Sequence, residues 1–72
     1  MDLKESIGIR VNGDPRRVSA GTTIAGMLGE LGLDARKVAV ERNREIVPRG
    51  GFDEVRVSEG DAFEIVHFVG GG

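Results

Sequence analysis

The sequence predicts an α+β domain with one helix packed on a sheet, and three observations predict it. Apolar and polar residues alternate over 7–11 and again over 38–41, which is the period of a half-buried strand. Apolar residues over 24–31 recur instead at helical spacing. Residues 62–69 form the most apolar stretch, typical of a central strand. A chain of 72 residues is one domain.

The first element is a predicted β-hairpin. Residues 7–11 carry inward Ile and Val, and residues 16–19 return as the second strand. Between them, the run Asn12-Gly13-Asp14-Pro15 is a strong turn signal, because Asn and Gly tolerate positive φ and Pro presets its own φ.

The helix is predicted over about 23–31. Thr23 is a suitable N-cap, and Gly32 suits the left-handed position that follows a helix end. Gly26 and Gly29 lie inside this helix, where each costs about 1 kcal/mol relative to Ala. The sequence offers no reason for either glycine.

The second half predicts three more strands. Residues 38–41 form a strand, 42–44 a tight turn, and 45–47 a short partner strand closed by Pro48. Residues 58–61 read as a solvated turn. In the final strand, alternation places one pair of large residues on each face: Phe63 and Ile65 on one, Val66 and Phe68 on the other.

Composition excludes several classes of function. Ten basic and twelve acidic residues are interspersed, and Tyr and Trp are absent, so we expect no nucleic-acid partner. The absence of cysteine removes disulfides and thiolate chemistry and is compatible with the cytoplasm, the location we expect. The sequence shows neither an apolar signal segment nor a run long enough to span a membrane.

No catalytic centre is apparent. His67 is the one histidine, and the serines at 6, 19 and 58 lie in terminal, strand-end or turn positions without a nucleophile elbow. Scattered acids and a single histidine make a poor metal site. We therefore expect no enzymatic activity, no metal and no bound cofactor in this chain.

The end of the chain is its most distinctive feature. The predicted domain covers 1–69, and Gly70, Gly71 and Gly72 follow as a tail that we expect to be flexible. Such a tail is thin enough to enter a narrow channel and deliver the carboxylate of Gly72 to another protein. That carboxylate is ionised and unreactive until it is activated, usually as an acyl-adenylate made from ATP. A sulfur nucleophile then gives a thiocarboxylate, and an amine gives an amide.

The chain resembles the ThiS-like sulfur carriers of thiamine biosynthesis over nearly its full length, and three stretches carry the match. They are the helix from Thr23 to Leu31, the segment VERNREIVPR at 40–49, and the segment DAFEIVHFVGGG at 61–72. The resemblance implies a ubiquitin-like β-grasp fold: a mixed five-stranded sheet with one main helix on one face. It also implies that Gly72 is the sulfur-carrying terminus.

The resemblance further implies the partners. A ubiquitin-activating-like adenylyltransferase would use ATP to adenylate Gly72, a cysteine desulfurase or rhodanese-type enzyme would supply sulfur, and thiazole synthase would accept it. Val66 and Phe68 would dock the partner from the sheet face away from the helix, although either could instead pack in the core. Arg42, Arg44 and Arg49 would steer docking by charge, with solvated loop residues as the alternative.

Several alternatives stay open. The small subunit of molybdopterin synthase has the same fold and terminal diglycine, although the absence of a proline between Phe68 and Gly70 favours thiamine. Carriers for tRNA thiolation or amino-acid synthesis are harder to separate. From other classes, an RNA-binding β-grasp module disagrees with the acidic balance, and a ubiquitin-like protein modifier shares the adenylation step.

Overall fold

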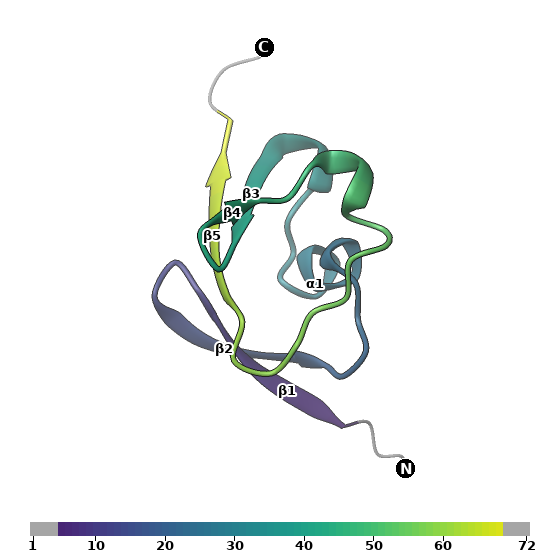
Figure 1. The fold of residues 1–72 in the computed structure, drawn as a ribbon, viewed down its shortest axis with the longest axis vertical. Helices are drawn as coiled ribbons and strands as arrows, with labels where there is room; N and C mark the ends of the chain where they lie inside the picture. Colours follow the sequence, from purple (N-terminus) through teal and green to yellow (C-terminus); the bar gives the residue numbers. More distant parts are fainter. Residues whose placement is uncertain (1–4, 69–72) are drawn as a thin grey trace.

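The fold consists of one five-stranded sheet and one α-helix (Figure 1). A computed structural model describes residues 5–68 of the chain. The elements are, in order, β1 (Ser6–Val11), β2 (Asp14–Ser19), α1 (Ile24–Glu30), the 3₁₀ turn η1 (Ala35–Lys37), β3 (Val38–Arg42), β4 (Glu45–Ile46), the 3₁₀ turn η2 (Arg49–Gly51) and β5 (Ala62–His67).

The sheet is mixed, with the strand order β2-β1-β5-β3-β4. The last strand, β5, lies at the centre, parallel to β1 and antiparallel to β3, and the two hairpins flank it. Helix α1 covers one face of this sheet (Figure 1). This is the β-grasp arrangement, so the predicted fold class is confirmed.

Both hairpin turns have the backbone conformation of a two-residue turn, with positive φ at both central residues. Asn12 and Gly13 have φ of 52° and 86°, and Asn43 and Arg44 have φ of 52° and 73°. Positive φ at both positions matches the right-handed twist of the flanking strands. The side chain of Asn12 also pairs with both backbone groups of Ile65, at 2.8 and 3.1 Å, and so joins the first turn to β5.

The core lies between α1 and the facing side of the sheet. Ile24, Met27 and Leu28 of α1 are fully buried, as the helical spacing predicts. The inward residues of the strands and of the segment after β4 complete it: Ile9, Val11, Val18, Val38, Val40, Val47, Phe52, Val57, Phe63 and Ile65.

Both ends of the helix are capped. Thr23 Oγ1 accepts from Gly26 N–H at 3.1 Å, which confirms the predicted N-cap. The preceding free N–H groups of Ile24 and Ala25 donate to carbonyls of the long segment between η2 and β5, so this segment is attached to the start of α1. At the other end Gly32 has the left-handed conformation that the sequence predicts, with φ of 77°, and the bonds from Leu33 N–H to Leu28 O and from Gly32 N–H to Gly29 O form a Schellman motif.

The two helical glycines are not equivalent. A Cβ on Gly26 would lie 2.2 Å from Thr22 Oγ1, whereas a Cβ on Gly29 would meet no atom within 4 Å. We therefore expect Gly26→Ala to destabilise the fold by about 1 kcal/mol, because Thr22 must move, and Gly29→Ala to stabilise it by about as much. Urea unfolding of both variants tests this. Stabilisation by both substitutions would contradict the role of the close contact at Gly26.

One sequence prediction needs correction. The 58–61 turn is not simply solvated, because Asp61 is only 6% exposed. Residues 35–37 and 49–51, where the sequence predicted neither helix nor strand, form the 3₁₀ turns η1 and η2. Within residues 5–68, no helix is long and apolar enough to cross a membrane, and no group of metal-ligating side chains is large enough to hold an ion.

Candidate functional site

The sheet face opposite α1, here called the open face, carries an exposed apolar surface. In β5, Phe63 and Ile65 point to the core, as predicted, so the alternating Val66 points away from it. The exposed fraction of Val66 is 61%, and that of Phe68, two residues further on, is 56%. Both residues predicted to bind a partner are thus accessible, and neither packs in the core.

Ile46 is a third exposed apolar residue, and the sequence analysis missed it. Its exposed fraction is 76%, the highest of the three. The signal was present: Ile46 and Val47 are adjacent, so in an extended segment only one can face the core, and Val47 does. Ile46 and Val66 line the same hollow of about 130 Å³ on the open face, together with Ala39, Val40, Glu41 and Glu64.

Phe68, the last described residue before the tail, is attached to the rest of the fold. Its N–H donates to Lys37 O at 2.9 Å. Its ring centroid lies 5.8 Å from Arg49 Cζ, which lies 5.6 Å from the ring of the buried Phe52. These are distances at which a guanidinium is attracted by an aromatic ring. The chain leading to the tail therefore starts from a fixed point.

Arg49 is engaged within the protein. Its Nη2 donates to Val38 O at 3.1 Å, and its Nη1 donates to Ala35 O. Ala35 begins η1 and Val38 begins β3, so the guanidinium of Arg49 connects η1, β3 and η2. Its predicted role in steering a partner stays a prediction.

The three arginines proposed to act together do not form one cluster. Arg42 ends β3, whereas Arg49 contacts Val38 at the start of the same strand. Arg42 Nε is paired with Asp61 Oδ2 at 2.9 Å, and Arg44 is exposed in the turn between β3 and β4. Their closeness in the sequence therefore does not correspond to one basic surface.

Asp61 is the buried polar centre of this end of the sheet. Its carboxylate accepts from Ser58 N–H at 2.8 Å, from Asn43 Nδ2 at 3.1 Å and from Arg42 Nε at 2.9 Å. Burial alone would raise the pKa of Asp61, but these hydrogen bonds outweigh it and hold the pKa below its usual value. Through these hydrogen bonds, the carboxylate connects the turn between β3 and β4 to the start of β5.

The surroundings of His67 offer no catalytic partner. This histidine lines a hollow of about 170 Å³ in the described part of the chain. The other lining residues carry no carboxylate, hydroxyl or thiol; they are Val11, Asn12, Arg16, Leu31, Leu33 and Ile65. A nucleophile with its base is therefore not assembled there. Gly70, Gly71 and Gly72, the predicted tail and sulfur-carrying terminus, lie outside the described residues.

Comparison with known proteins gives a consistent result. Residues 9–72 match the model of the ThiS family. The chain is 46% identical over 50 residues to the sulfur carrier protein ThiS of Bacillus subtilis, covering 69% of this chain and 76% of that protein. It is similar in structure to the thiamine biosynthesis protein ThiS of Geobacter metallireducens, with a TM-score of 0.78, 36% identity, and coverage of 92% of this chain and 100% of that one.

Larger proteins also contain a similar segment. The chain is 56% identical over 62 residues, 86% of its length, to a thiazole synthase of Paramagnetospirillum magneticum. A thiazole synthase of Magnetococcus marinus is 50% identical over 64 residues, 89% of this chain. The matched segment makes up 19% and 20% of these two proteins, so the chain spans about a fifth of their length.

Proposed function

The chain belongs to the ThiS family of small sulfur carriers, and from this premise we propose that it carries sulfur on the carboxylate of Gly72 for the synthesis of the thiazole ring of thiamine. One observation carries the proposal: a central strand leads through the anchored Phe68 toward three glycines that end the 72-residue sequence. The proposal requires a free carboxylate at Gly72.

The chemistry needs two steps. A carboxylate oxygen of Gly72 attacks the α-phosphorus of ATP, which forms an acyl-adenylate and releases pyrophosphate. A sulfide sulfur then attacks the acyl carbon, and AMP leaves with one carboxylate oxygen. If the nucleophile is instead the outer sulfur of a persulfide, the same displacement gives an acyl disulfide. A second thiol of the sulfur donor then breaks its S–S bond, which releases the thiocarboxylate and leaves the two donor sulfurs joined as a disulfide. Both routes give a thiocarboxylate. An activating partner binds the ATP and supplies the catalytic groups, so this chain is a co-substrate and needs no cofactor of its own.

The glycine tail suits this role for steric reasons. Three residues extend at most ~10 Å, and without side chains they fit a channel that any larger residue would block. The last described residue, Phe68, is held by Lys37 and Arg49, so the chain has a fixed position two residues before the first glycine of the tail. A partner that docks on the open face would therefore receive the terminus at a defined place.

The proposed partners follow from the chemistry and from the relatives. An adenylyltransferase of the ubiquitin-activating type activates Gly72, and a cysteine desulfurase or rhodanese-type enzyme supplies sulfur. Thiazole synthase as the acceptor is supported by two proteins of that name that contain a segment similar to this chain. The same names favour the thiazole pathway over molybdopterin synthesis or tRNA thiolation.

A direct test of activation is ATP–pyrophosphate exchange with the adenylyltransferase of the same organism. Labelled pyrophosphate should enter ATP only when the chain is present, because the acyl-adenylate is the species that pyrophosphate attacks in the reverse step. Exchange that does not depend on the chain would contradict the proposal.

Phe68→Ala is expected to weaken partner binding more than it weakens the fold. The ring is more than half exposed, so its loss should lower the melting temperature by less than about 5 °C, whereas affinity for thiazole synthase should fall about tenfold. Titration calorimetry and thermal unfolding measure the two effects. Phe63→Ala is the matched control, because Phe63 is buried and its loss should mainly destabilise the fold. A large stability loss with unchanged affinity would place Phe68 in a structural role.

A further inference from the structure

Two carboxylates of like charge face each other on the open face. Glu41 of β3 and Glu64 of β5 are directly opposite in the antiparallel register, and both are exposed. Directly opposed side chains have Cβ atoms about 5 Å apart, and like charges at such positions destabilise a sheet. The described ion pairs join Arg36 to Asp34 and Arg42 to Asp61, so within residues 5–68 neither glutamate is neutralised by an ion pair.

This pair lies within the exposed apolar surface. Both glutamates line the hollow of about 130 Å³ whose other walls include Ile46 and Val66. In the register of the sheet, Ile46 is the direct neighbour of Glu41 on one side, and Glu64 is its neighbour on the other. Any protein surface that covers Ile46 and Val66 must therefore cover the two carboxylates as well.

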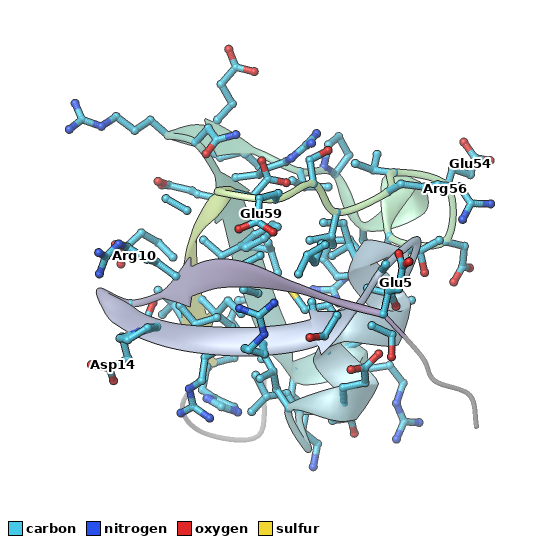
Figure 2. The ribbon with its side chains drawn as sticks, turned by 90° about the horizontal axis from the view of Figure 1, so that it is seen from below. Glu5, Arg10, Asp14, Glu54, Arg56 and Glu59 are labelled. Atoms are coloured by element: carbon cyan, nitrogen blue, oxygen red, sulfur yellow. The ribbon has the colours of Figure 1, made fainter. Side chains whose placement is uncertain are left out.

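Cations of the chain itself lie to one side of this pair. Arg10 and Arg44 line a neighbouring hollow that reaches Glu64 but not Glu41. Figure 2 shows Arg10 on β1, close to the first hairpin turn, and its Nη1 donates to Gly13 O at 3.3 Å. Among the described residues, the Glu41 carboxylate has no ion-pair partner and is exposed to solvent.

The free-energy cost of removing the Glu41 and Glu64 carboxylates from water limits which partner surface can bind over them. Removing two neighbouring carboxylates from water without a compensating cation is expensive, whereas a cation with good hydrogen-bond geometry offsets the penalty. A purely apolar partner surface would bury both charges unpaired. The partner must therefore bring a positive group to the hollow.

We propose that the open face receives an arginine side chain of the partner protein, with its guanidinium between Glu41 and Glu64 and its aliphatic stem against Ile46 and Val66. Arginine fits both features, because its planar group has five donors that can reach two carboxylates and its stem packs on apolar surface. This assignment rests on the proposed function, since it takes thiazole synthase as the partner.

The proposal predicts two effects of opposite sign for the double variant Glu41→Gln/Glu64→Gln. Loss of the repulsion should raise the melting temperature of the isolated chain by roughly 2 °C. Loss of the charge that meets the arginine should lower affinity for thiazole synthase at least about tenfold and flatten its dependence on salt. A purely structural role for the glutamates would not produce this combination.

The matched control is Asp53→Asn/Glu54→Gln, which changes the net charge by the same amount. Both control residues are exposed, and Glu54 projects outward on the side of the sheet where α1 lies (Figure 2). Glu59 is unsuitable as a control, because its Oε1 accepts from Gly8 N–H at 3.1 Å.

The experiment is calorimetric titration of the wild type and both double variants into purified thiazole synthase of the same organism, at low and at high salt. The expected result is weakened, less salt-dependent binding for the Glu41/Glu64 variant and near wild-type binding for the control. Equal affinity of all three proteins, or equal weakening in the control, would overturn the arginine assignment alone. A wild-type chain that does not bind the synthase would contradict the proposed function, and the assignment would fall with it.

Discussion

Deletion of Gly72 is expected to abolish adenylation and to change the free energy of unfolding by less than about 0.5 kcal/mol. The core of the described residues runs from Ile9 to Ile65, so we expect it to keep its packing when the terminal residue is removed. The reacting carboxylate, by contrast, moves back by one residue, about 3.5 Å, which is enough to lose contact with a fixed catalytic site. ATP–pyrophosphate exchange and thermal unfolding report the two quantities.

Gly72→Ala is the informative companion variant, because it keeps the carboxylate in place and adds one methyl group. If the tail enters a narrow channel, this variant should activate far more slowly than the wild type while it keeps the same stability. Full activity of the alanine variant would contradict the channel argument. Full activity of the deletion variant would contradict the role of Gly72 itself.

Asp61→Asn is expected to cause the largest loss of stability among single polar substitutions, about 2–3 kcal/mol or roughly 10–20 °C in melting temperature. The Asp61 carboxylate accepts from three donors, so an amide NH₂ in its place would face at least one of them without an acceptor. Asp53→Asn, at an exposed turn position, should leave the melting temperature almost unchanged. Comparable stability of the two variants would contradict the role of the buried carboxylate.

The same carboxylate makes stability depend on pH with a defined sign. Because hydrogen bonds hold the pKa of Asp61 below its unfolded value of about 3.9, its contribution is complete above that pH and is lost as the pH falls through the folded-state pKa. The stability difference between wild type and Asp61→Asn should therefore shrink between about pH 5 and pH 2. The pKa of Asp34, lowered to about 2 by the Arg36 hydrogen bond, affects both proteins equally and cancels.

Local patterns predicted most of the fold because most of it is decided locally. Alternation fixes which face of a strand is buried, and two-residue turns with Asn12 or Asn43 at positive φ fix the register of both hairpins. The helix start at Thr23 and its end at Gly32 follow from cap chemistry in the same way. The assignment of these elements to a β-grasp fold rested instead on the family resemblance, and the order of the strands comes from the structure.

Specific side-chain contacts account for what was missed. Gly26 is explained by the close approach of the Thr22 hydroxyl four residues earlier, which hydrophobic periodicity does not indicate. In the sequence, Asp61 has the surroundings of an ordinary turn residue. In the fold, Arg42 and Asn43, which are distant in sequence, donate hydrogen bonds to its carboxylate. Val57 becomes a core residue because its segment pairs with the chain before α1.

For the candidate site too, predictions from strand alternation agree with the structure, whereas the grouping by closeness in sequence does not. Alternation placed Val66 and Phe68 opposite Phe63 and Ile65, and the family resemblance made them the docking residues; in the structure both have more than half of their surface exposed. The three arginines were grouped by their closeness in sequence, and the length of β3 separates Arg42 from Arg49. The role of Gly72 follows from chemistry and family membership, and direct measurement must test it.

The most direct measurement is intact-mass spectrometry of the chain after incubation with ATP, a sulfide source and the adenylyltransferase of the same organism, followed by a thiol-selective alkylating reagent. Oxidation of Met1 or Met27 gives nearly the same nominal mass gain as exchange of oxygen for sulfur, but a sulfoxide does not react with the reagent. The sequence contains no cysteine, so a thiocarboxylate is the group that takes the label. The account predicts one label per chain that disappears when Gly72 is deleted. A chain that stays unlabelled, or a label that survives the deletion, would contradict it.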